Sequence, residues 1–188
     1  MILPAPGPDE VIVGITVTVP APYAGVLTAA RHASGDPEAA LIAPHVTLVG
    51  PALVSVRDLP AVDEHLERVA AAHAPFVVHL RGTGSFRPVS PVVFVALARG
   101  IASCEQLERA IRTGPLDIPL RFPYHPHVTV AQDVDDAALD AAEAGLAEFD
   151  ESFPVTEIDR YVRGGDGAWR PVRSFALTGA QDAQARPR

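Results

Sequence analysis

The sequence contains no lysine and no asparagine, and it has one cysteine in 188 residues. A single cysteine, Cys104, excludes an intrachain disulfide and a metal site built from several cysteines. All fifteen basic residues are arginine, and acidic residues outnumber them, so the formal net charge is -8 at pH 7. Because affinity for long nucleic acid depends on a basic surface that neutralises phosphates, this charge disfavours a protein that wraps such a polymer. Any phosphate recognition is therefore expected to be local and to involve few charges.

The sequence also lacks a hydrophobic run long enough to span a membrane. Its first ten residues have neither the basic segment nor the apolar segment of a signal peptide. We therefore expect no membrane contact and a cytoplasmic location. No long exposed apolar segment demands a partner, so a monomer is the expected state. The content of 48% hydrophobic and 20% charged residues is that of an ordinary globular domain.

Apolar periodicity and turn residues predict strands that alternate with helices. The expected strands cover residues 11–19, 41–50, 75–86, 91–98, 122–132, 153–164 and 169–179. The expected helices cover residues 23–35, 58–73, 103–113 and 135–147, with Ser103 capping the third and Cys104 as one of its small residues. This order predicts an α+β fold with antiparallel sheets. We expect an N-terminal extension over 1–10, one bilobal domain over 11–179 and a flexible tail over 180–188.

One tetrapeptide pattern, His-Val-Thr followed by an aliphatic residue, occurs twice, in "APHVTLVG" and "HPHVTVAQ". In a strand, alternate side chains point to opposite faces, so His45 and Thr47 share one face, as do His127 and Thr129. The aliphatic residues between them then pack under helices. The two histidines are 127 − 45 = 82 positions apart, nearly half of the chain. This spacing indicates an internal duplication in which each lobe contributes one half of a central cleft.

Two imidazoles can together cleave a phosphodiester near neutral pH. The neutral ring takes a proton from the attacking water or hydroxyl, and the protonated ring gives one to the leaving oxygen. The hydroxyls of Thr47 and Thr129 can donate hydrogen bonds to the non-bridging phosphate oxygens. This chemistry predicts catalysis by His45 and His127 without a metal or another cofactor.

The paired motifs resemble those of the two-histidine (2H) phosphoesterase superfamily, and in particular its bacterial 2′-5′ RNA ligase-like proteins. The resemblance covers residues 11–177 and implies a bilobal fold with two pseudo-twofold αβ lobes. It implies catalysis by His45 and His127, with the phosphate bound by Thr47 and Thr129. It also implies a substrate that carries a 2′,3′-cyclic phosphate, a 2′-5′ phosphodiester or a nucleotide-derived cyclic phosphate. Some RNA ligase-like members have an arginine shortly after the second motif, where this chain has Ala131-Gln132.

Three further residues are candidate substrate contacts. His125 shares the face of His127 and could line the cleft; a zinc site with the other histidines is disfavoured because nothing supplies an obvious further ligand. Phe86 and Arg87 lie in a hairpin turn, where they could stack on a base and contact a phosphate, or could simply anchor the loop.

Four other residues are open to two interpretations. Arg121 and Arg163 are either phosphate clamps or solvated surface arginines. Trp169 is expected to cover the core rather than contact a ligand. Tyr124 has the parity opposite to that of His127, which favours a core or edge position.

The sequence leaves two rival functions beside the phosphodiesterase. One is a nucleotide- or RNA-binding module that uses the same cleft without turnover. The other is 2′-5′ RNA ligation, which is the reverse reaction and needs the same residues. In each case the expected partner is a small nucleotide or an RNA end.

Overall fold

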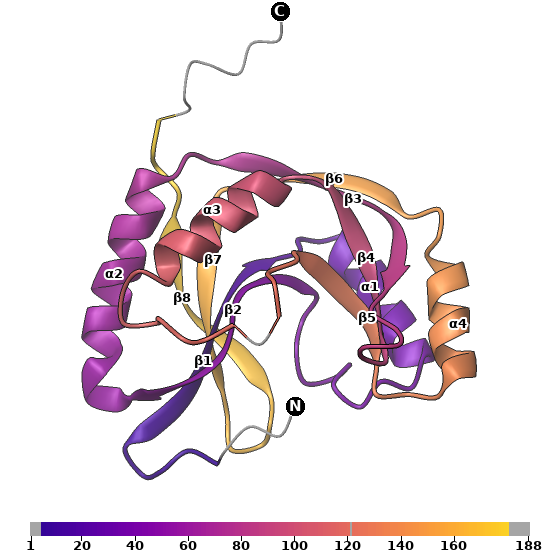
Figure 1. Ribbon diagram of the computed structural model, residues 1–188, viewed down its shortest axis with the longest axis horizontal. Coiled ribbons are helices and arrows are strands. Elements are labelled where there is room, and N and C mark those ends of the chain that lie inside the picture. The colour runs from indigo at the N-terminus through magenta and orange to yellow at the C-terminus, as the bar shows by residue number, and fades with distance from the viewer. Residues whose placement is uncertain (1–4, 121, 181–188) are drawn as a thin grey trace, which may run out of the picture.

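The computed structural model describes residues 5–120 and 122–180. Arg121, residues 1–4 of the expected N-terminal extension and residues 181–188 of the expected tail lie outside the described residues. The described chain forms two four-stranded antiparallel sheets with helices packed against them, as Figure 1 shows. None of the described helices is long and apolar enough to cross a membrane.

The two sheets have matching strand orders. Sheet A has the order β2-β1-β7-β8, and its strands are β1 (Glu10–Thr18), β2 (His45–Ser55), β7 (Glu157–Arg163) and β8 (Trp169–Ala176). Sheet B has the order β5-β4-β3-β6, and its strands are β3 (Phe76–Ser85), β4 (Val92–Arg99), β5 (His127–Gln132) and β6 (Asp150–Val155). The two motif strands, β2 and β5, therefore occupy corresponding edges of the two sheets.

Four α-helices pack against the sheets, and two of them cross from one sheet to the other. The helices are α1 (Tyr23–Ala33), α2 (Leu59–Ala72), α3 (Ile101–Ile111) and α4 (Asp136–Gly145), with a short 3-10 helix η1 (Val56–Asp58) before α2. Helix α1 follows β1 of sheet A but contacts β5 of sheet B, and α3 follows β4 of sheet B but contacts β2 of sheet A. Helix α2 contacts β8, and α4 contacts β3, β4 and β5. The α+β fold with antiparallel sheets is thus confirmed, and each sheet depends on a helix from the other.

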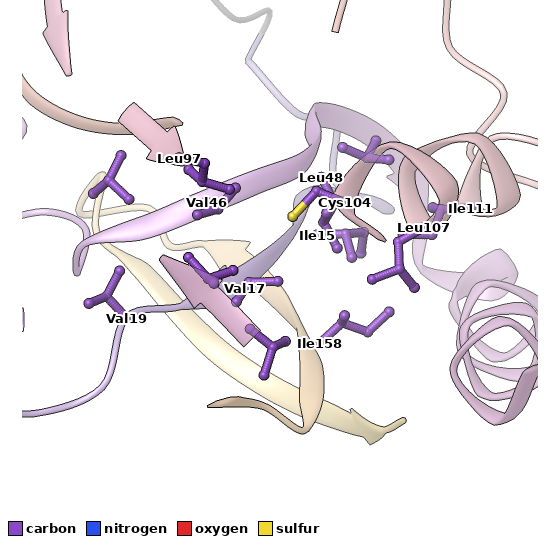
Figure 2. Close-up of a cluster of buried hydrophobic side chains, with 14 of the residues drawn as sticks. Ile15, Val17, Val19, Val46, Leu48, Leu97, Cys104, Leu107, Ile111 and Ile158 are labelled. Atoms are coloured by element: carbon purple, nitrogen blue, oxygen red, sulfur yellow. The ribbon is translucent and has the colours of Figure 1, made fainter. Parts of the chain in front are cut away.

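The hydrophobic core is built from aliphatic side chains of both sheets and the helices that cover them. Figure 2 shows the part around β1, β2 and α3, where Ile15, Leu48 and Cys104 lie together. Cys104 has no exposed surface, and its burial raises the pKa of the thiol to about 12. The cysteine is therefore a small core residue of α3, as its place in a predicted helix indicates, and its thiolate is not available at neutral pH.

The boundaries of several predicted elements need correction, and the strand expected from residue 122 begins only at His127, as β5. The strand predicted over 153–164 is two strands, β6 and β7, which belong to different sheets. The N-cap of α3 is Gly100, with φ 94°, and not Ser103, which lies inside the helix. Strand β2 begins at His45 rather than at Leu41, because residues 41–44 form the loop that leads into it.

Candidate active site

Both His-Val-Thr motifs alternate in the structure as strand geometry requires. His45 and Thr47 of β2, and His127 and Thr129 of β5, are all partly exposed. The aliphatic residues between and after them are buried and point to the opposite face: Val46, Leu48, Val128 and Val130. We call the face that carries the histidine and threonine the site face of each sheet. The hydrophobic residues fix the register of the two strands, so the polar side chains cannot turn into the core.

The two motif strands contact each other where the edges of the sheets meet. The Tyr124 hydroxyl, just before β5, donates a hydrogen bond to the main-chain carbonyl of Thr47 at 2.9 Å. The charge of His127 is the smallest of the causes that lower the pKa of His45, so the two imidazoles interact electrostatically. The fold therefore brings together two motifs that are 82 residues apart in the sequence.

Each motif holds its imidazole in the same way. His45 Nδ1 lies 2.8 Å from the carbonyl oxygen of Ala43, and His127 Nδ1 lies 2.7 Å from that of His125. A carbonyl oxygen can only accept, so in both rings Nδ1 carries the hydrogen and donates it. In the neutral ring Nε2 is then the unprotonated nitrogen, free to accept or return a proton. In both motifs a proline separates the histidine from the residue whose carbonyl orients it.

Both imidazoles are held neutral at pH 7 in the ligand-free protein. Burial lowers the pKa of His45 to about 4, and the positive charges of Arg31 and His127 act in the same direction. Burial also lowers the pKa of His127, with a smaller contribution from the charge of His125. A phosphate anion between the rings would act in the opposite direction, because a nearby negative charge favours the protonated imidazole.

The surroundings of His127 are aromatic. The ring centroids of Phe86 and Phe94 lie 4.9 Å and 5.2 Å from that of His127, and the Phe86 ring stands nearly perpendicular to it. His125 lies beside the same group, 5.6 Å from Phe86. Phe86 and His125 are thus next to a motif histidine, as expected for residues that could contact a substrate.

Arg87, in contrast, is directed to helix α4. Its guanidinium contacts Asp140 at 2.7 Å and Glu143 at 3.0 Å, and it also donates to the Ser85 hydroxyl. These bonds would have to break before Arg87 could reach a phosphate, so the geometry favours its role as a loop anchor. A substrate contact of Arg87 stays a prediction.

The surroundings of His45 are polar, unlike those of His127. Thr18 lies opposite His45 in the β1–β2 pair, and its hydroxyl donates to the Asp159 carboxylate at 2.5 Å. The Tyr161 hydroxyl is 3.0 Å from the Thr18 hydroxyl, and the Tyr161 ring lies 6.5 Å from that of His45. Ser174 donates to the other oxygen of Asp159 at 2.6 Å. The two half-sites therefore share their motifs but differ in what surrounds them.

Sequence reasoning did not single out Thr18, Asp159, Tyr161 or Arg31. Thr18 follows the buried Val17 in β1, and Asp159 and Tyr161 lie on either side of Arg160 in β7, so strand alternation could have placed each on one face of its strand, but not beside His45. Arg31 is buried in α1 and pairs with Asp36 at 2.7 Å. No local pattern indicates that this helix crosses to the other sheet. Among the described residues, no group of three or more His, Cys, Asp or Glu side chains is placed to hold a metal ion.

Comparisons with known proteins give a consistent result. A predicted phosphoesterase of Bacillus licheniformis is 30% identical over 145 residues, which is 76% of this chain and 85% of that protein. The LigT protein of Escherichia coli, in its apo form, superposes with a TM-score of 0.67 at 22% identity, over 90% of this chain and 99% of LigT. LigT has also been crystallised with 3′-AMP and with ATP.

A protein of Thermus thermophilus superposes with a TM-score of 0.64 at 22% identity, over 90% of this chain and all of that protein. These structures share the two-lobed fold described above. The family model of the 2′-5′ RNA ligase superfamily matches residues 19–167. The chain belongs to this superfamily.

Proposed function

We propose that the protein is a phosphodiesterase that uses His45 and His127 as a general acid–base pair. The substrate is a 2′,3′-cyclic phosphate or a 2′-5′ phosphodiester on a nucleotide or an RNA end. One observation carries the proposal: two motif histidines on contacting edge strands each donate Nδ1–H to a main-chain carbonyl, which leaves both Nε2 atoms for proton transfer. The nucleotides bound by LigT and the name of the Bacillus licheniformis relative agree with this substrate class.

In the proposed reaction, one imidazole accepts a proton from water through Nε2 while the water oxygen forms a bond to phosphorus. The other imidazole, protonated at Nε2, gives its proton to the ribose oxygen as the bond from phosphorus to that oxygen breaks. The Thr47 and Thr129 hydroxyls donate to the non-bridging oxygens, where negative charge increases. Proton exchange with solvent then restores both rings. The two imidazoles supply both proton transfers, so this mechanism needs no metal.

Either ring can serve as base or as acid. Burial is the largest cause that lowers the pKa of both His45 and His127, so both rings are neutral before the substrate binds. The charge of the bound phosphate then stabilises a proton on the ring that lies next to the leaving oxygen.

The test is hydrolysis of a panel of 2′,3′-cyclic nucleotides and 2′-5′ dinucleotides with a chelator present. Wild type should turn over at least one member, and His45→Ala or His127→Ala should each lower kcat by about 10³-fold, because a positioned acid or base contributes 10²- to 10⁴-fold. His79→Gln is the control, since that imidazole bonds to Asp150 on another strand pair. Near-normal turnover by either alanine variant would refute the acid–base pair.

A further inference from the structure

Trp169 lies on the site face of sheet A and not against the hydrophobic core. Trp169 is directly opposite Arg163 in the β7–β8 pair. Residues 159, 161 and 163 of β7 point to the same side of the sheet as Thr18 of β1. The indole atom Cζ3 is 3.3 Å from the point that a Cβ at Gly14 would occupy. Gly14 therefore leaves room for the indole over β1, on the same face as His45.

Arg163, opposite Trp169 in the strand pair, has no hydrogen-bond acceptor for its guanidinium among the described residues. Within residues 5–120 and 122–180, no carboxylate or carbonyl bonds to it, and three other arginines share this property: Arg57, Arg99 and Arg109. Those three are exposed to solvent, whereas Arg163 is half-buried. A shielded cation without a partner is costly, because it loses part of its hydration and gains no hydrogen bond in exchange. An anionic ligand would supply the missing acceptor.

The neighbouring arginine does not offer the same charge. Arg170 makes two hydrogen bonds to the Asp166 carboxylate, at 3.0 Å and 2.5 Å, and this pairing holds the pKa of Asp166 well below its usual range. The charge of Arg170 is therefore already balanced. Arg163 Nη2 lies 3.6 Å from the point that a Cβ at Gly167 would occupy, which places its guanidinium against the turn of this hairpin.

A hollow of about 600 Å³ lies between this hairpin and the loop that precedes the histidine motif. It is lined by residues of α1, by the loop 39–43 and by residues 168–170. The Trp169 main-chain N–H donates to the Leu41 carbonyl at 2.7 Å. The same loop ends at Ala43, whose carbonyl orients His45. A ligand that fills the hollow from Trp169 would therefore extend toward the proposed catalytic histidine.

The spacing along β1 fits a neighbouring unit of a longer substrate. Gly14, under the indole, and Thr18, opposite His45, are four residues apart, which is about 13 Å along a strand. A phosphate held by His45 would not also reach Arg163. An aromatic face beside an unpaired guanidinium is the combination that binds a base and its phosphate in single-stranded nucleic acid.

We propose, on the basis of the function proposed above, that Trp169 and Arg163 form a subsite for a second nucleotide unit of the substrate. The base of that unit stacks on the indole, and its phosphate pairs with the guanidinium. The preferred substrate is then an oligonucleotide end rather than a mononucleotide. The subsite needs only one positively charged side chain, so it is compatible with a chain whose net charge is -8.

Trp169 is the only tryptophan in the sequence, so tryptophan fluorescence reports on this subsite alone. His45→Ala protein, which should not consume the ligand, is titrated with a cyclic mononucleotide and with a dinucleotide that ends in the same 2′,3′-cyclic phosphate. The dinucleotide should change the tryptophan fluorescence in a saturable way and bind about tenfold more tightly. Adding Arg163→Gln should weaken dinucleotide binding about tenfold. Arg109→Gln should leave it unchanged, since Arg109 is an exposed arginine on α3 without a partner among the described residues.

Turnover gives the second readout. Wild type should prefer the dinucleotide in kcat/KM, and this preference should fall about tenfold in Arg163→Gln and in Trp169→Leu. Equal binding of the two ligands, or equal effects of Arg163→Gln and Arg109→Gln, would refute the subsite even if both substrates are hydrolysed. If the fluorescence response depends on Arg163 but neither ligand is hydrolysed by wild type, the subsite is supported and the proposed reaction is refuted for these phosphodiesters.

Discussion

The Tyr124 hydroxyl donates a hydrogen bond to the main-chain carbonyl of Thr47 at 2.9 Å. This bond joins β2, the strand of the first motif, to the segment that leads into β5, the strand of the second motif. Burial raises the pKa of this phenol, so it stays protonated and able to donate at any pH of interest. The bond acts on the backbone of β2 two residues after His45. It therefore couples the positions of the two half-sites.

We expect Tyr124→Phe to lower kcat about tenfold with little change in KM, because the two imidazoles would no longer be held at a fixed separation. The free energy of unfolding should fall by about 1 kcal/mol, the usual contribution of one hydrogen bond. Tyr23→Phe is the matched control, since no described residue bonds to the Tyr23 hydroxyl. A loss of stability with unchanged kcat would mean that Tyr124 is only structural.

The low pKa of His45 makes the protein less stable in acid. Below pH 6.5 the unfolded chain binds a proton at this residue, whereas the folded chain does not until the pH approaches 4. The free energy of unfolding should therefore fall as the pH falls from about 6.5 to about 4, by at most about 3 kcal/mol for this residue. Denaturant unfolding of wild type and His45→Gln at pH 7 and pH 4.5 measures the difference. If wild type and His45→Gln lost the same free energy of unfolding between pH 7 and pH 4.5, the low pKa could not be assigned to His45.

Thr47 and Thr129 are expected to act on the transition state more than on the fold. Replacing either by valine keeps the shape of the side chain but removes the donor to the phosphate oxygens. We expect each variant to lower kcat by about 10²-fold, as for the loss of one donor to a developing negative charge. The exposed Thr156→Val serves as control, and melting temperatures should be similar for all three. A variant that changes KM alone would show that its threonine binds substrate and transition state equally.

Phe86 lies next to His127 and is a candidate substrate contact. We expect Phe86→Ala to raise KM for purine cyclic nucleotides about tenfold, because stacking of one base on an aromatic ring contributes about 1 to 3 kcal/mol. Val89→Ala, in the same hairpin turn and 71% exposed, provides the control for a general change in the loop. If KM is unchanged while stability falls, Phe86 serves only to pack against Phe94.

The sequence was sufficient to predict the motif strands because their alternation is strict. The face of His45 and Thr47 follows from strand period alone, and the buried Val46 and Leu48 enforce it. The assignment of strands to sheets could not be predicted in this way. Residues 153–164 keep one continuous β pattern, yet the chain leaves sheet B at Val155 and enters sheet A at Glu157.

Trp169 shows the same limit at the level of one side chain. An aromatic residue in an amphipathic strand usually covers the core, and the sequence predicts this position for Trp169. Its actual position over Gly14 depends on the absence of a side chain 155 positions earlier in the sequence (169 − 14 = 155). Propensity and periodicity describe a segment by itself, so they carry no information about such a pair.

The crossing of α1 and α3 also constrains how such a chain could arise by duplication. Helix α1 contacts the second motif strand and α3 contacts the first, so each half of the sequence covers part of the hydrophobic surface of the other. Helices α2 and α4 also cover sheets that contain strands of their own half. A single ancestral copy would have had to exchange the crossing helix with a second copy, as in a domain-swapped dimer. Gene fusion would then have made that exchange permanent and allowed the surroundings of the two histidines to diverge, one polar and one aromatic.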